Sequence, residues 1–167
     1  MALPSGAISM SQVNTFLSRS STASLSFNDS QFRFIANQSS GSVSFSNLRG
    51  KQGGAGTCRL YMVSDGKGGS YYYGDRNEGR VTGQTDGYNL FVVYQDNTFG
   101  GGYLQSTSSS GFTNGVSNYR AQVGSGTVYS NWYTDAGSTG GTVLYQSSNF
   151  VNSGELNTWI NWIAVRT

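Results

Sequence analysis

Short apolar and aromatic runs alternate with glycine-containing turn signals throughout residues 57–167. Eight runs have the composition of β-strands, and the gaps between them contain Asp-Gly, Gly-Gly, Asn-Gly or Ser-Gly pairs. This spacing leaves no room for a long helix. It predicts a mainly β fold, and more specifically an antiparallel β-sandwich of jelly-roll or lectin-like type. The predicted strands are 59–64, 70–73, 88–95, 102–105, 119–123, 127–133, 142–146 and 159–166.

The chain changes character near Lys51. All 11 tyrosines and all three tryptophans follow this residue, as do 21 of the 24 glycines. We therefore expect residues 1–51 to form a small module, residues 52–56 a glycine-rich linker, and residues 57–167 the β-sandwich. In the last predicted strand, Trp159 and Trp162 fall on opposite faces, so that one belongs to the core and the other does not.

Residues 1–51 contain an internal repeat. An apolar-Ser-apolar triplet begins at Ile8, Leu25 and Val43, at spacings of 17 and 18 residues. Each triplet predicts a short strand that is followed by a short helix, at 12–17, at 29–36 and, cut short by glycine, at 47–50. Such units bury little apolar surface alone, so we expect the module to dock onto another structure.

Several classes of chemistry are excluded or disfavoured. The chain has no histidine, which removes the usual general base and every catalytic triad that needs one, and we expect no enzymatic activity. Cys58 is the only cysteine and is expected to be a buried thiol, and neither a metal ion nor a cofactor is predicted. Asp75 and Glu78 lie close in sequence, in what the pattern indicates is a solvated turn.

Two kinds of partner are also disfavoured. No apolar run approaches the length of a membrane helix, so no membrane insertion is expected. The three arginines of the first part lie 14 and 16 residues apart, and with Lys51 they form no dense stripe, so nucleic acid is not an expected partner.

Two aromatic clusters are the candidate binding residues. Tyr71, Tyr72 and Tyr73 follow one another in a predicted strand, so at least one ring faces outward, and Trp132 and Tyr133 form a similar pair. Exposed rings beside amides and carboxylates suit the binding of a sugar. The alternative is that these rings pack in the core or across a subunit interface.

Residues 3–51 resemble a recurrent N-terminal module of tailed-bacteriophage virion proteins. The resemblance is carried by Ser9-Met10-Ser11, by residues 19–23 (RSSTA), by Asn28-Asp29 and by the segment 40–51. Ser18 stands where that family usually has glycine, and Arg49 stands where tyrosine is common. Residues 57–167 resemble no known family.

The resemblance implies attachment to a virion rather than an activity. Together with the composition, it predicts a non-enzymatic structural component of the tail, baseplate, collar or head surface, made in the host cytoplasm and released on lysis. Residues 1–51 would anchor to other virion proteins, with Arg19, Arg33 and Arg49 as candidate contacts, and the sandwich would be exposed or form a homo-oligomer. The alternative function is a receptor-binding or carbohydrate-binding module that recognises host surface glycans.

Overall fold

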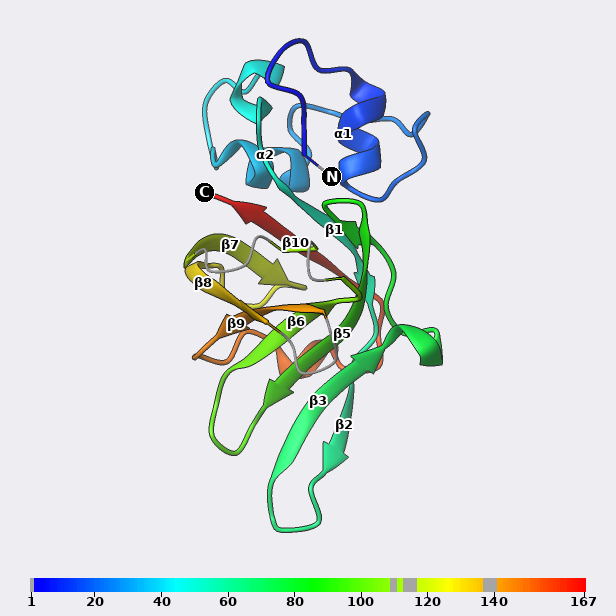
Figure 1. Ribbon diagram of the computed structural model, residues 1–167, viewed down its shortest axis with the longest axis vertical. Helices are drawn as coiled ribbons and strands as arrows, with labels where there is room; N and C mark the ends of the chain where they lie inside the picture. Colours follow the sequence, from blue (N-terminus) through cyan, green and yellow to red (C-terminus); the bar gives the residue numbers. More distant parts are fainter. Residues whose placement is uncertain (1, 109–110, 113–116, 137–140) are drawn as a thin grey trace.

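Eight antiparallel strands close into a β-barrel in the computed structural model, which describes residues 2–108, 111–112, 117–136 and 141–167. The pairing of β5 with β6 closes the ring. Two further strands, β2 (Tyr61–Ser64) and β3 (Ser70–Asp75), lie outside it as a hairpin that pairs with β5 and extends from the barrel (Figure 1). Around the ring the strands are β1 (Gly53–Cys58), β10 (Ile160–Arg166), β7 (Ser117–Val123), β8 (Tyr129–Ala136), β9 (Thr142–Gln146), β6 (Gly102–Ser106), β5 (Tyr88–Asp96) and β4 (Gln84–Thr85).

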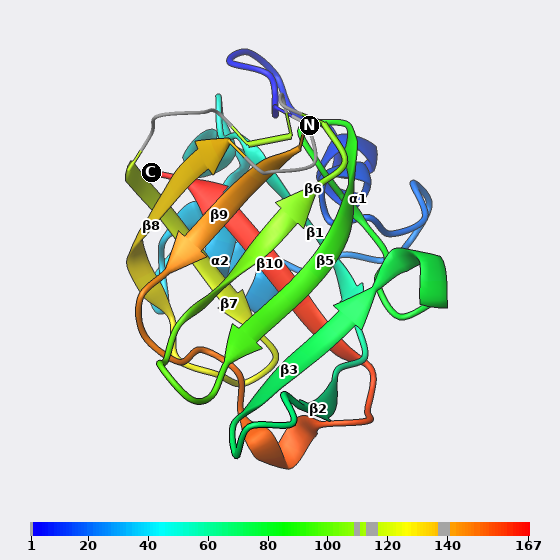
Figure 2. The ribbon, with the colours of Figure 1, turned by 60° about the horizontal axis from the view of Figure 1, so that its bottom comes forward.

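The predicted β-sandwich is therefore wrong. Strand β5 is nine residues long, so one of its edges pairs with both β4 and β3 while its other edge pairs with β6. The sheet thus continues around the molecule and leaves no second, separate sheet (Figure 2). The alternation of inward and outward residues is the same in a sandwich and in a small barrel, so the residue pattern does not distinguish them.

The glycine-rich segment predicted as a linker lies in strand β1 instead. Its residues are almost all buried, and β1 pairs with β10 on one side and with β4 on the other. A side chain at Gly54 or Gly56 would collide with backbone carbonyl oxygens of the segment 82–84. These glycines therefore allow a close approach of backbones rather than providing flexibility.

Large side chains fill the interior of the barrel. Trp132 and Trp162 are fully buried there, and the indole N–H of Trp162 donates to the carbonyl oxygen of Thr82 at 2.8 Å. Cys58 is part of this core, as predicted, and its burial raises the pKa of the thiol to about 12. Trp159 is 51% exposed, so the two tryptophans of the last strand divide between core and surface as expected.

Residues 2–51 fold into two short helices and a 3-10 turn. Helix α1 (Met10–Phe16) begins at a capping box made by Ser9 and Gln12, and in helix α2 (Ser30–Ala36) the Asp29 carboxylate accepts hydrogen bonds from two backbone N–H groups. The turn η1 (Phe45–Leu48) follows Ser44. Among the described residues, neither these helices nor any other is long and apolar enough to cross a membrane.

The short strands predicted for the repeat do not form. Each triplet leads directly into a helix or turn and pairs with no other strand. Ile8, Leu25 and Val43 instead lie half-buried against an apolar cluster beneath the helices. A helix separates each triplet from the next, and the triplets form no shared sheet. Their apolar residues nevertheless pack against the same cluster.

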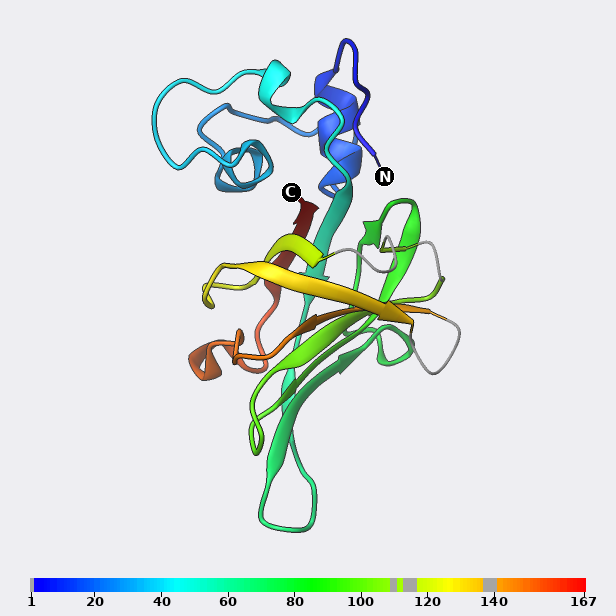
Figure 3. The same cartoon turned by 60° about the vertical axis from the view of Figure 1, so that its left-hand side comes forward.

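The module docks onto the outer surface of the barrel over β1 and β10 (Figures 1 and 3). Ala55 of β1 and Ile163 and Val165 of β10 belong to the same apolar cluster as the module's core. The fully buried members of this cluster from the helices and η1 are Val13, Phe16, Phe32, Ile35 and Leu48. The module and the barrel thus share one core. We call the barrel surface formed by Ala55, Ile163 and Val165 the covered face.

Candidate binding surface: a row of tyrosines

Six tyrosines form a continuous row across six neighbouring strands on the outside of the barrel and its hairpin. Successive members are direct cross-strand partners, and no strand of the series lacks a tyrosine. Figure 2 shows strands β3, β5, β6, β9 and β8 side by side on this face. In order from β2 to β8, the tyrosine row consists of Tyr61, Tyr73, Tyr94, Tyr103, Tyr145 and Tyr133.

The outward direction of the row follows from the period-two alternation of each strand. Leu104 and Leu144, the neighbours of Tyr103 and Tyr145, lie in the barrel core, as do Val93 before Tyr94 and Trp132 before Tyr133. The tyrosines themselves are partly exposed, and Tyr133 is 46% exposed. The same alternation that fills the barrel thus places a phenol on the opposite face of each strand.

The rings of neighbouring members contact one another along the row, except that Tyr73 and Tyr94 are linked through Tyr71. Tyr94 and Tyr103 are stacked with centroids 4.9 Å apart, and Tyr145 and Tyr133 are stacked at 5.5 Å. The intervening pair, Tyr103 and Tyr145, is edge-to-face at 5.7 Å. Tyr71 lies beside the row and contacts both Tyr73 and Tyr94. Cross-strand aromatic pairs of this kind stabilise a sheet by about 0.5–1.5 kcal/mol each.

Carboxylates accompany the row at its hairpin end. The hydroxyl of Tyr73 donates to Asp75 Oδ2 at 2.9 Å, and the hydroxyl of Tyr61 donates to Glu78 Oε2 at 3.1 Å. Glu78 lies in the turn η2 (Arg76–Glu78), which Asp75 caps. The row ends at Arg80, whose guanidinium lies 4.4 Å from the centroid of the Tyr61 ring.

Two phenols of the row, those of Tyr73 and Tyr94, have a pKa raised above the ordinary value. Burial raises the pKa of Tyr73 far above its ordinary value, and the hydrogen bond to the Asp75 carboxylate raises it further. Burial and the charge of Asp96 similarly raise the pKa of Tyr94. At neutral pH these hydroxyls are therefore hydrogen-bond donors, and the adjacent carboxylates are acceptors.

The structure separates the aromatic residues singled out from the sequence. Tyr73 and Tyr133 belong to the row and Tyr71 adjoins it, but Tyr72 pairs with Met62 on the opposite face of the hairpin. Trp132 is fully buried against Phe150, with ring centroids 4.7 Å apart, so the surface contact predicted for it does not hold. Adjacent strand residues face opposite ways, and Tyr133 takes the outward position.

Sequence reasoning missed four members of the row, namely Tyr61, Tyr94, Tyr103 and Tyr145. Each lies within a predicted strand, but none forms a cluster in the sequence. Only the register of the strands brings them together. The available signal was that a tyrosine recurs in successive predicted strands at positions next to core residues.

The three arginines predicted as anchoring contacts do not share a surface. Arg19 pairs with Asp29, Nη1 to Oδ2 at 2.9 Å, and Arg33 donates to Asn28 Oδ1 and to the Gly41 carbonyl oxygen. Arg49 lines a separate hollow beside the last residues of the chain. Burial of Asp29 acts to raise its pKa, but hydrogen bonds from Arg19 and the Phe32 N–H outweigh this and lower it.

The described part of the chain contains no group of three or more cysteine or acidic residues that could hold a metal ion. Comparison with family models, with curated proteins and with solved structures gives no match. The resemblance of residues 3–51 to a phage module therefore stays a prediction.

Proposed function

We propose that this chain is a non-enzymatic binding protein that holds an extended carbohydrate chain along the tyrosine row. The observation that carries the proposal is the register of the six tyrosines, which places a partly exposed ring on every strand from β2 to β8 in the series.

The chemistry of the row suits a sugar polymer. Aromatic rings pack against the apolar C–H face of a pyranose, and neutral phenols donate to its oxygens. The carboxylates of Asp75 and Glu78, which accept from the hydroxyls of Tyr73 and Tyr61, have further lone pairs for sugar hydroxyl groups at one end of the row. Neighbouring strands lie about 4.8 Å apart, so the five steps of the row span about 24 Å, enough for several sugar units rather than one.

Affinity electrophoresis through gels that contain β-glucan, galactomannan, xylan or amylopectin tests this proposal. We expect at least one polysaccharide to retard the protein, and Tyr103→Ser at the centre of the row to abolish the retardation. Tyr88→Ser is the matched control, because Tyr88 is 41% exposed on the same sheet but lies outside the row. No retardation by any of the four, or equal loss in both variants, would contradict the proposal.

A structural role in a tailed-phage particle is the second candidate function. It is favoured by the resemblance of residues 3–51 and by the docking of the module, which would carry the barrel in a fixed orientation. In this proposal the module's outer surface contacts other virion proteins, and the barrel faces outward or forms a homo-oligomer. The two candidates are compatible, since a virion surface protein can also bind a host glycan.

The structure changes how this second candidate is tested. Deleting residues 1–51 would uncover Ala55, Ile163 and Val165, so a failure to assemble could reflect misfolding. The variant Met10→Ser instead alters a side chain that is 40% exposed on the module. Reduced incorporation into particles is expected, with Phe99→Ser on the barrel as the control. Unchanged incorporation would count against the anchoring role.

A further inference from the structure

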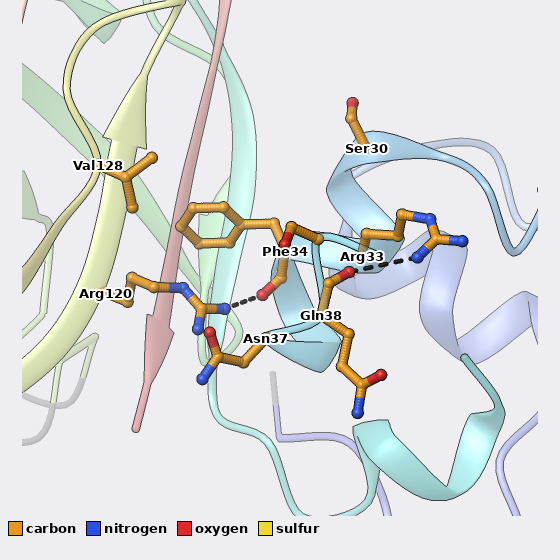
Figure 4. Close-up of a pocket in the computed structure, with 8 residues that line it drawn as sticks. Ser30, Arg33, Phe34, Asn37, Gln38, Arg120 and Val128 are labelled. Carbon is orange, nitrogen blue, oxygen red and sulfur yellow. Dashed lines mark hydrogen bonds between the residues drawn. The ribbon is translucent and has the colours of Figure 1, made fainter. Parts of the chain in front are cut away.

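A hollow of about 390 Å³ lies where the module meets the barrel, at the C-terminal end of α2. This is within the size range of small-molecule sites. Both parts of the molecule contribute to it, since Arg120 lies on β7 and Val128 precedes β8 (Figure 4). The lining residues are Ser30, Arg33, Phe34, Asn37, Gln38, Ser39, Arg120 and Val128.

Arg120 is a buried cation with unused hydrogen-bonding capacity. The residue is 6% exposed, its Nη2 donates to the carbonyl oxygen of Phe34, and its guanidinium lies 4.4 Å from the centroid of the Phe34 ring. Its Nη1 is buried and has no hydrogen-bond partner among the described residues. A buried N–H group without an acceptor destabilises a protein, so an acceptor at this position is favoured.

The hollow has positive charge and no acid in its lining. None of the eight lining residues is Asp or Glu. The acceptors of Arg33 are neutral, namely the side-chain oxygen of Asn28 and the backbone oxygens of Gln38 and Gly41. Burial lowers the pKa of Arg120, which reflects a desolvated charge. An anionic group in the hollow would therefore find the guanidinium of Arg120, whereas that of Arg33 points away from Arg120 (Figure 4).

Apolar surface adjoins this charge. Val128 is 44% exposed, and the ring of Phe34 forms the wall beneath the guanidinium. The C-terminal end of α2 carries partial negative charge, which disfavours a doubly charged phosphate more than a singly charged carboxylate. We propose that the hollow binds a carboxylate attached to a small aliphatic body, with Arg120 Nη1 donating to the carboxylate and Val128 contacting the aliphatic part. This site is independent of the tyrosine row.

Titration of the full chain with isobutyrate and with isobutyramide, followed by NMR, tests the proposal. The two probes have the same shape and differ in charge. We expect isobutyrate to shift the Arg120 side-chain N–H and the Val128 methyl signals to saturation, and isobutyramide to bind at least about ten-fold more weakly because a charge-assisted hydrogen bond is lost. Inorganic phosphate at matched ionic strength is the third probe, and a response equal to that of isobutyrate would overturn the carboxylate assignment.

A matched pair of variants tests whether a carboxylate from the protein itself can occupy the hollow, without altering Arg120. Val128→Asp adds a carboxylate at the rim, and Val128→Asn adds an amide of the same size. The response to isobutyrate should disappear in Val128→Asp. In Val128→Asn it should weaken but remain saturable, because the apolar contact is lost while the hydrogen bond from Arg120 is kept. An unchanged response in Val128→Asp, or no saturable response at Arg120 in the unaltered protein, would overturn the proposal.

Discussion

The barrel wall has two outer surfaces rich in apolar atoms, and the molecule covers only one of them. The covered face consists of small and aliphatic side chains, and the module's core closes over it. The tyrosine row consists of rings with polar tips, and the described residues leave all six partly exposed. An aliphatic side chain forms no hydrogen bonds with water, whereas a phenol can keep its hydroxyl solvated or hydrogen-bonded. The difference assigns the covered face to folding, and it is the basis on which we propose binding along the row.

The largest effect is expected from weakening the module's core, which closes over the covered face. Phe32→Ala removes a fully buried ring from the shared core and is expected to lower the free energy of unfolding by about 3–5 kcal/mol. Denaturant-induced unfolding measures this loss. Phe99→Ala, which truncates a ring that is 90% exposed, should change the stability by no more than about 0.5 kcal/mol. Similar losses in the two variants would show that the module adds little to the fold.

A smaller effect is expected at the contact between module and barrel made by Ser18. Its hydroxyl donates to the Ala55 carbonyl oxygen at 2.6 Å and accepts from the Gln84 N–H at 3.2 Å, and its φ of 55° is in the left-handed region. Ser18→Ala should cost about 1–2 kcal/mol because the hydrogen bonds are lost. Ser18→Gly loses the same bonds but relieves the backbone, so it should be about 1 kcal/mol more stable than Ser18→Ala. Equal stabilities would contradict this account of Ser18.

Within the row, the ring contacts should stabilise the sheet only modestly. A double-mutant cycle with Tyr94→Ser and Tyr103→Ser is expected to give a coupling of about 0.5–1.5 kcal/mol, since these rings stack at 4.9 Å. Unfolding of the two single variants and the double variant measures this coupling. A coupling well above this range would make the row primarily a structural feature and would weaken the contrast with the covered face.

The smallest effect concerns pH. Because the pKa of Tyr73 is raised in the folded protein, the unfolded state loses this proton first, and the phenol lowers stability as pH rises past about 10, its ordinary value. Below that pH the phenol is protonated in both the folded and the unfolded state, so it adds no pH dependence to the stability. Tyr73→Phe should therefore unfold with a shallower alkaline decline than the unaltered protein. An identical pH dependence of the unfolding free energy would contradict the raised pKa.

Much of the secondary structure could be predicted from local sequence. The eight predicted strands all coincide with observed strands, because runs such as 88–95 contain residues that favour extended backbone. Strands β1 and β4 were missed. The first is rich in glycine, which resembles a flexible segment, and the second has only two residues. Without these two strands the prediction contains no closed ring, since β4 and β1 connect β5 to β10.

The candidate site depends on information that a single sequence does not contain. Tyr103 and Tyr145 are 42 positions apart in the numbering, and their contact depends on the register between β6 and β9. Local aromatic clustering found only the part of the surface near Tyr71–Tyr73 and Tyr133. It also selected Trp132, because the alternation of a strand predicts that two neighbours face opposite ways but not which one faces inward.

The most direct test of the central claim is the dependence of affinity on ligand length. Oligosaccharides of increasing length, cut from a polysaccharide that retards the protein, would be titrated against the unaltered chain and against Tyr133→Ser at the end of the row. We predict that affinity rises with length until the ligand spans the row, and that Tyr133→Ser weakens only the longest ligands. An affinity that does not depend on length, or an equal loss for short and long ligands, would contradict binding along the tyrosine row.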